Sequence, residues 1–178
     1  MPPRNHKDWI KQPKVEYISS LIYSDHSLFE QEQENIFSKV WVPMCHSSEL
    51  PHLGDFRTTK IALHNVVAIR FESGKVKTFL TDNVLRPAGN DLSLTYHSGM
   101  WVELPCEIKH GGMVWTTLNT NPTMSVDEWT AGAFDCIADA IDTEEMEVFH
   151  YHKAIVDTNY KLWHDTNSEF YHDFMHYF

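Results

Sequence analysis

The stretch that decides the fold is residues 65–80, which read NVVAIRFESGKVKTFL. Two runs rich in β-branched and aromatic residues, Val66–Phe71 and Val76–Leu80, lie on either side of the turn residues Ser73–Gly74. This pattern predicts a β-hairpin. A further run at Gly112–Leu118 also has strand character, so the middle of the chain is predicted to form an antiparallel β-domain.

Helices are predicted on both sides of this β-domain. After a Pro-containing arm at Met1–Glu16, apolar residues at helical spacing predict a helix from Ser27, with Ser24, Asp25 or Ser27 as the N-cap. The elements predicted after the β-domain are a helix at Val126–Ile141, a strand at Val148–Val156 and a helix at Thr158–Phe178. The fold class is therefore α+β.

The predicted domain organisation has three parts. An N-terminal arm and helix occupy residues 1–45, a reduced β-domain occupies 46–120, and the start of a second domain occupies 121–178. The last predicted helix runs to the end of the sequence without a C-cap or a helix breaker. We therefore expect the sequence to be a truncated piece of a larger fold.

Composition limits the classes of function. The chain has 178 residues with 42% hydrophobic and 22% charged residues, which is typical of a globular protein. Its net charge of -11 argues against nucleic acid or an anionic membrane surface as a partner. The longest apolar stretches, such as Asn65–Ile69, are far shorter than the run of about 20 residues that a membrane-spanning helix needs. Three irregularly spaced cysteines and no secretion signal favour the cytoplasm.

The last predicted helix carries a face that suits a metal ion. Asp165, Glu169, His172 and His176 fall at i, i+4, i+7 and i+11, so all four share one side of the helix. A solvated polar face is the simpler explanation of such a stripe. However, the neighbouring aromatic residues and Met175 predict a helix that is buried nearly all round, where polar groups must be paired or bound to metal. Two imidazoles with carboxylates suit divalent iron.

This segment resembles the iron-ligand segment of the catalytic (alpha) subunits of Rieske-type non-haem iron oxygenases. The matching residues are Asn159–Leu162, Asp165, Asn167, Glu169, Tyr171–His172 and His176. Earlier segments are similar to the family in the family's own order: Ile36–Phe37, Val40–Pro43, Cys45–His46, Ser48–Pro51, Gly54–Phe56, Arg70, Gly74–Val76, Phe79–Leu80 and Lys109–Trp115. The N-terminus and Asn159–His176 also resemble the methanesulfonate monooxygenase branch.

The resemblance implies roles for individual residues. His172 and His176 would be two ligands of a mononuclear Fe(II), and Glu169 would be the catalytic carboxylate that carries electrons from a neighbouring subunit's cluster to that iron. Asp165 and Asn167 would orient the ligands. The family's third iron ligand is an aspartate that this sequence does not contain. The family usually has four residues between the two histidines, whereas this chain has three.

The [2Fe-2S] cluster of the family is not expected here. A Rieske cluster needs a Cys-x-His and a Cys-x-x-His pair. Where the first pair should follow Phe79–Leu80, the chain has Asn83 and Leu85, and no cysteine precedes Tyr96–His97. The stretch from Leu80 to His110 is also too short for both cluster loops. Cys45 and Cys106 are instead predicted to be buried structural cysteines.

The family implies further partners and an activity. Its members associate as trimers or alpha/beta assemblies, take electrons from NAD(P)H through a reductase or ferredoxin, and hydroxylate a small organic substrate, here an aromatic compound or a sulfonate. Two alternatives stay open. One is an inactive remnant that acts at most as a subunit-interaction module. The other is a di-iron carboxylate protein that uses two Glu-x-x-His pairs, Glu169 with His172 and Glu147 with His150, plus Glu30 or Glu34.

Overall fold

The computed structural model describes residues 19–81, 101–136, 139 and 146–168. The chain divides into two compact units. The larger unit is Glu32–Tyr151, and the smaller unit combines Met1–Gln31 with His152–Phe178. The domain boundaries expected from the sequence stay a prediction.

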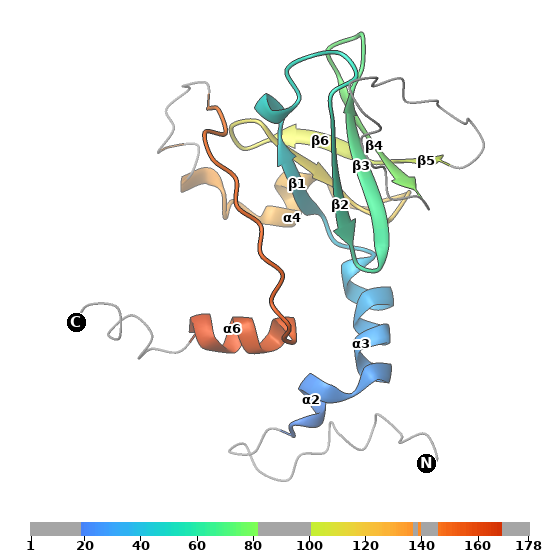
Figure 1. Cartoon of the computed structure of the whole chain (residues 1–178), viewed down its shortest axis with the longest axis vertical. Helices are drawn as coiled ribbons and strands as arrows, with labels where there is room; N and C mark the ends of the chain where they lie inside the picture. The colour runs from blue at the N-terminus through green and yellow to red at the C-terminus, as the bar shows by residue number, and fades with distance from the viewer. Residues whose placement is uncertain (1–18, 82–100, 137–138, 140–145, 169–178) are drawn as a thin grey trace. The chain divides into compact units, whose positions relative to one another are not determined.

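The larger unit contains two antiparallel sheets (Figure 1). One sheet has the order β2-β3-β4-β5, formed by Phe56–Ile61, His64–Arg70, Val76–Thr81 and Trp101–Leu104. The other has the order β1-β7-β6, formed by Val42–His46, Met113–Thr116 and Cys106–Lys109. The predicted antiparallel β-domain and the α+β class are therefore confirmed.

The hairpin that decided the prediction is present. β3 pairs with β4 from Asn65 opposite Thr81 to Arg70 opposite Val76. Gly74 closes the turn with a φ of 71°, a left-handed conformation that glycine adopts without a steric cost. Four consecutive residues of β3, Val66–Ile69, are buried, because this strand has a neighbour on each side and a covered surface on each face.

The core lies on both faces of this hairpin. Ala68 packs with Cys45 and Val114 of the other sheet, so the two sheets face one another. Between them, the hydroxyl groups of Thr78 and Thr116 form a buried hydrogen bond of 2.8 Å, which satisfies two polar groups that would otherwise destabilise the core. On the opposite face of β3 lies a second cluster, formed by Val67, Ile69 and Phe79 with Phe56, Phe71 and Trp101.

Short helices complete the larger unit. They are the π-helix η1 at Gln33–Phe37, the 3-10 helix η2 at Ser47–Glu49 and α4 at Val126–Thr130. Ser125 and Glu128 form a capping box at the start of α4. The predicted single helix at Val126–Ile141 is wrong, because Ala131 and Gly132 adopt left-handed conformations that end α4 after five residues.

The smaller unit contains the helices α2 at Leu21–Ser24 and α6 at Tyr160–Ser168, and all of α3 at His26–Glu32 except its last residue. Asp25 is the N-cap of α3, because its carboxylate accepts hydrogen bonds from the backbone N–H groups of Ser27 (2.9 Å) and Leu28 (3.1 Å). Of the three N-cap candidates, the structure selects Asp25. The predicted C-terminal helix is present over the residues of α6, and residues 169–178 lie outside the described chain. None of the helices in the described ranges is long and apolar enough to cross a membrane.

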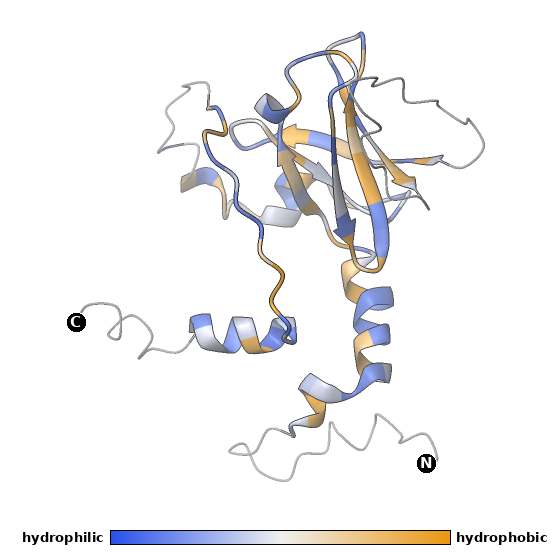
Figure 2. Cartoon of the chain, in the orientation of Figure 1, coloured by the Kyte–Doolittle hydropathy of each residue, from blue (hydrophilic) through white to orange (hydrophobic). Residues whose placement is uncertain are grey.

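The strand predicted at Val148–Val156 is wrong. These residues have no regular secondary structure, and Phe149 and Ile155 are almost fully exposed. Figure 2 shows hydrophobic residues along the irregular chain that precedes α6. A strand forms only when a neighbouring strand pairs with its backbone, and no strand in the described ranges pairs with this segment.

Candidate functional site

The start of α6 is held by one tyrosine of α2. Asn159 caps the helix, because its side-chain oxygen accepts a hydrogen bond from the backbone N–H of Lys161 at 3.0 Å. The amide nitrogen of the same side chain donates to the backbone carbonyl of Tyr23 at 2.9 Å. The Tyr23 hydroxyl donates a short hydrogen bond to the Asp165 carboxylate. Tyr23 therefore contacts α6 at its cap and again more than one turn later.

These contacts favour the protonated form of the Tyr23 hydroxyl. Its pKa is raised above the ordinary value of 10.0, mainly because the neutral hydroxyl donates to Asp165, with burial and the negative charge of that carboxylate as lesser causes. Tyr23 is the donor and Asp165 the acceptor of this hydrogen bond. The predicted role of Asp165, to orient iron ligands, stays a prediction, because those ligands lie outside the described residues.

The predicted site residues are divided between described and undescribed chain. Asp165 and Asn167 lie on α6, and both are exposed. Glu169, His172 and His176 lie outside the described residues, so their predicted roles are untested. The expectation of a helix buried nearly all round is wrong for the described half, because Leu162 and Trp163 are exposed. The aromatic residues after Ser168, on which that expectation rested, are not described.

The cysteines do not form a cluster site in the described chain. Burial raises the pKa of the Cys45 thiol to about 12 and that of the Cys106 thiol to about 11, so both are protonated at neutral pH. They lie on β1 and β6, which flank β7 on its two sides. Cys136 is exposed, and its thiol donates to the carbonyl of Ala133. The described ranges contain no group of three or more His, Cys, Asp or Glu residues that could hold a metal ion.

Cys45 is buried, as predicted, and Cys106 is half-buried against the same core cluster. The positions at which the cluster ligands were sought, Asn83, Leu85 and His97, lie outside the described residues. Two carboxylates of the di-iron alternative belong to no group of metal-ligating side chains in the described chain. The Glu30 carboxylate lies 3.4 Å from the His26 ring, and Glu147 is exposed on the irregular segment.

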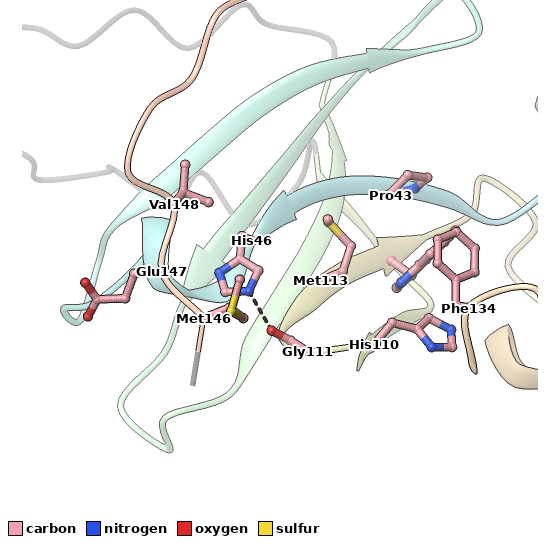
Figure 3. A pocket seen from close by; sticks show the side chains of 10 residues that line it. Pro43, His46, His110, Gly111, Met113, Phe134, Met146, Glu147 and Val148 are labelled. Atoms are coloured by element: carbon pink, nitrogen blue, oxygen red, sulfur yellow. Dashed lines mark hydrogen bonds between the residues drawn. The ribbon is translucent and has the colours of Figure 1, made fainter. Parts of the chain in front are cut away.

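Sequence reasoning missed a cavity in the larger unit. It has a volume of about 280 Å³, and its lining combines β1, β7, the chain after α4 and residues 146–148 (Figure 3). The only local signal is the alternation Met113-Val114-Trp115, which places Met113 and Trp115 on one face of β7. The other walls come from Pro43, Phe134, Met146 and Val148, whose proximity no local pattern reveals.

The sequence was compared with known proteins. No family model matches it. It is 40% identical to the methanesulfonate monooxygenase hydroxylase subunit alpha of Methylosulfonomonas methylovora, over 99% of this chain and 54% of the relative. It is 32% identical to the 2-aminobenzenesulfonate 2,3-dioxygenase subunit alpha of an Alcaligenes species, over 98% of this chain and 54% of that relative. The chain thus spans about half the length of these two curated relatives.

The alignment also shows that this chain is shorter than its relative over the matched region. It runs over 227 positions, whereas the chain has 178 residues, so at least 49 aligned positions are gaps in this chain. Such a difference agrees with the shortened segment between Leu80 and His110 that the sequence indicated.

The fold agrees with solved structures of the same kind. A quaternary ammonium Rieske monooxygenase superimposes with a TM-score of 0.67 at 20% identity, over 85% of this chain and 52% of the other. At that identity the likeness speaks for the fold alone. The sheets, the sequence of motifs and the two curated relatives lead to one assignment: the chain belongs to the alpha subunits of the Rieske-type oxygenases.

Proposed function

We propose that this chain is a shortened form of the catalytic subunit of a Rieske-type non-haem iron oxygenase that binds mononuclear Fe(II) but builds no [2Fe-2S] cluster of its own. The observation that carries the proposal is its 40% identity, over 99% of its length, to a methanesulfonate monooxygenase alpha subunit. The names of the relatives favour a sulfonate or an aromatic compound as the substrate of the complete oxygenase.

In this proposal His172 and His176 ligate the iron and Glu169 is the carboxylate that links it to an electron donor. When bound, the iron supplies the oxygen-activating chemistry. The chain's own contribution is to position the helix that precedes these residues. The support for this is local: Asn159 caps α6, and Tyr23 binds both Asn159 and Asp165. Asn167 and Asp165 would then orient groups at the site.

The cysteines argue against a cluster in this chain. A Rieske centre needs two thiolates on one iron and two imidazoles on the other, whereas Cys45 and Cys106 lie on β1 and β6 against the apolar core cluster between the sheets. Cys136 is exposed and lies on neither sheet. Electrons would therefore have to come from a homologous oxygenase subunit, supplied in turn by a ferredoxin or a reductase.

The test is the anaerobic analysis of iron and acid-labile sulfide in the purified chain. We expect iron without sulfide in the parent protein and loss of the iron in a His172→Ala/His176→Ala variant. A matched control is His150→Ala/His152→Ala, because this second pair of histidines is exposed on the irregular segment before α6. Sulfide in stoichiometric amount would contradict the cluster-less proposal, and iron retained by the first variant would contradict the ligand assignment.

A subunit-interaction module without activity is the second candidate. It is favoured by the exposed apolar residues of the irregular segment, which include Phe149, Tyr151, Ile155 and Val156. Large exposed apolar groups of this kind are typical of surfaces that bind another polypeptide. Absence of iron from both the parent and the His172→Ala/His176→Ala variant, together with a stable complex with an oxygenase alpha subunit in light scattering, would favour this function.

A further inference from the structure

The cavity is formed within the larger unit. All ten of its lining residues belong to Glu32–Tyr151, and no residue of α6 contributes to it. None of these lining residues is one that is proposed to hold iron. The cavity can be judged on its own shape and chemistry.

The walls of the cavity are apolar. Met113 and Trp115 point from one face of β7, and Pro43 is the residue of β1 that pairs with Trp115. Phe134 lies at one end, and Met146 and Val148 lie at the other (Figure 3). The backbone N–H of Val148 donates to the Ser48 hydroxyl at 3.0 Å, which holds the irregular segment against the rest of the unit.

The polar side-chain groups around the cavity are either hydrogen-bonded within the protein or buried from solvent. His46 is held at both ring nitrogens, by the Ser48 hydroxyl at 2.8 Å and by the Gly111 carbonyl at 2.7 Å. The ring nitrogens His110 Nε2 and Trp115 Nε1 have no hydrogen-bond partner among the described residues, but both are buried from solvent. The surface offered to a ligand is therefore mostly carbon and sulfur, with the exposed Glu147 as the charged neighbour.

The aromatic residues form a rigid end wall. The ring of His110 stacks on Phe134 with centroids 4.8 Å apart. Trp115 meets Phe134 at nearly a right angle, with centroids 5.2 Å apart. Offset and edge-to-face arrangements of this kind extend readily to a further ring. The thioethers of Met113 and Met146 also make favourable contacts with aromatic rings.

We propose that this cavity binds a small uncharged aromatic molecule. An apolar cavity of about 150 Å³ is enough for benzene, so about 280 Å³ has room for a benzene ring with a small substituent. A charged ligand would lose its hydration against walls that are mostly carbon and sulfur, where the ring nitrogens of His110 and Trp115 are covered from solvent. An anion would in addition be repelled by Glu147 and by the net charge of -11.

The test uses toluene as the probe and the methionine methyl groups as reporters. The full chain, labelled with ¹³C at its methionine methyls and kept in a metal chelator, is titrated with toluene and followed by NMR. Ring-current shifts are expected at Met113 and Met146, which line the cavity, and not at Met44 or Met124, which do not. Benzoate, the charged analogue, is expected to leave all four methyl signals unchanged.

Two matched substitutions locate the binding. Val148→Phe places a ring in the cavity and is expected to weaken toluene binding at least tenfold. Val102→Phe makes the same change at an exposed position of β5, outside the cavity, and is expected to leave the affinity unchanged. The methyl signals of Met44 report whether each variant keeps its core, because Met44 packs against the clusters between the sheets.

Three results would overturn the proposal. One is the absence of any shift at Met113 and Met146 up to saturating toluene, which would mean that the cavity is closed or filled by the chain itself in solution. Another is equal shifts at Met124, which would indicate non-specific contact. The third is unchanged affinity in a folded Val148→Phe protein, which would place the toluene elsewhere.

Discussion

The larger unit, which contains the two sheets, and the helix α6 retain different features of the family. In the sheet unit the fold is kept by packing: Val66, Val67 and Ala68 are fully buried, although no cluster ligands were found in the sequence. In α6 the family's polar residues are kept, but none of the described residues of the helix is buried. The difference teaches that the sheet unit has a packed core of its own, whereas the described residues of α6 contribute none, so the helix is held by polar contacts such as those of Tyr23.

The largest expected effect on the free energy of unfolding is seen when one buried and one exposed phenylalanine are each replaced by alanine. Phe79→Ala removes a ring that is 2% exposed and packs against Phe71 and Trp101, so the free energy of unfolding should fall by about 3–5 kcal/mol. Phe149→Ala removes a fully exposed ring and should change it by less than about 0.5 kcal/mol. Urea unfolding followed by circular dichroism measures both. Equal losses would mean that Phe149 is buried in solution.

A second substitution tests the close approach of Gly112, in the turn before β7, to the side chain of His46 at the end of β1. Gly112 has a φ of 107°, and a Cβ atom there would lie 2.6 Å from His46 Nε2. Gly112→Ala should therefore cost about 2–4 kcal/mol, from the backbone conformation and the clash together. Gly74→Ala is the control, since it has a positive φ but open space around the Cβ, and should cost less. Relief of the Gly112→Ala loss in a His46→Ala background would confirm the contact.

A third prediction concerns acid stability of the sheet unit. The backbone N–H and the hydroxyl of Ser125 donate to the Glu128 carboxylate and lower its pKa below 4.5. This contribution is present above the unfolded pKa and is lost as the pH falls through the lower, folded pKa. Glu128→Gln should therefore flatten the fall of the urea midpoint between pH 5 and 3, as measured by titration. Glu72→Gln, in the exposed β3–β4 turn, should leave that slope unchanged; an equal change in both would contradict the assignment.

The smallest effect is expected in the smaller unit. Tyr23→Phe removes the hydroxyl that donates to Asp165 but leaves the backbone carbonyl that binds Asn159. Backbone amides of α6 should exchange hydrogen faster, whereas Tyr151→Phe, on the exposed segment, should leave them unchanged. Because the pKa of Tyr23 is raised, its stabilising contact is present below pH 10 and lost as the pH rises through the folded pKa. Slower or unchanged exchange in Tyr23→Phe would show that the contact does not hold α6.

Local sequence patterns correctly predicted features that depend on neighbouring residues in the chain. The β3–β4 hairpin follows from the two strand-forming runs around Ser73–Gly74. Side-chain chemistry narrowed the N-cap to Ser24, Asp25 or Ser27, and the structure selects Asp25. The strand at Val148–Val156 failed because strand propensity needs a neighbouring strand. The long helix after Ser125 failed because left-handed Ala131, a residue that seldom takes this conformation, ends it.

The candidate site was only partly predictable. Spacing alone placed Asp165 on one helix face with His172 and His176, and the role of these residues remains a prediction. The contact of Tyr23 with Asp165 joins positions 142 residues apart, and the cavity brings Phe134 and Met146 to β7. Contacts between distant segments follow from the whole fold, so no single-sequence pattern contains them.

The direct pairing of β4 with β5, Thr81 opposite Trp101, has a consequence for protein engineering. The two strands are already joined in the sheet, so the length of the connection at 82–100 affects stability mainly through loop-closure entropy. Each doubling of a loop costs about 0.6 kcal/mol, and a further 49 residues would thus cost about 1 kcal/mol. The paired strands β4 and β5 should therefore accept an insertion of about this length between them, because their hydrogen bonds already hold the two ends of the connection together.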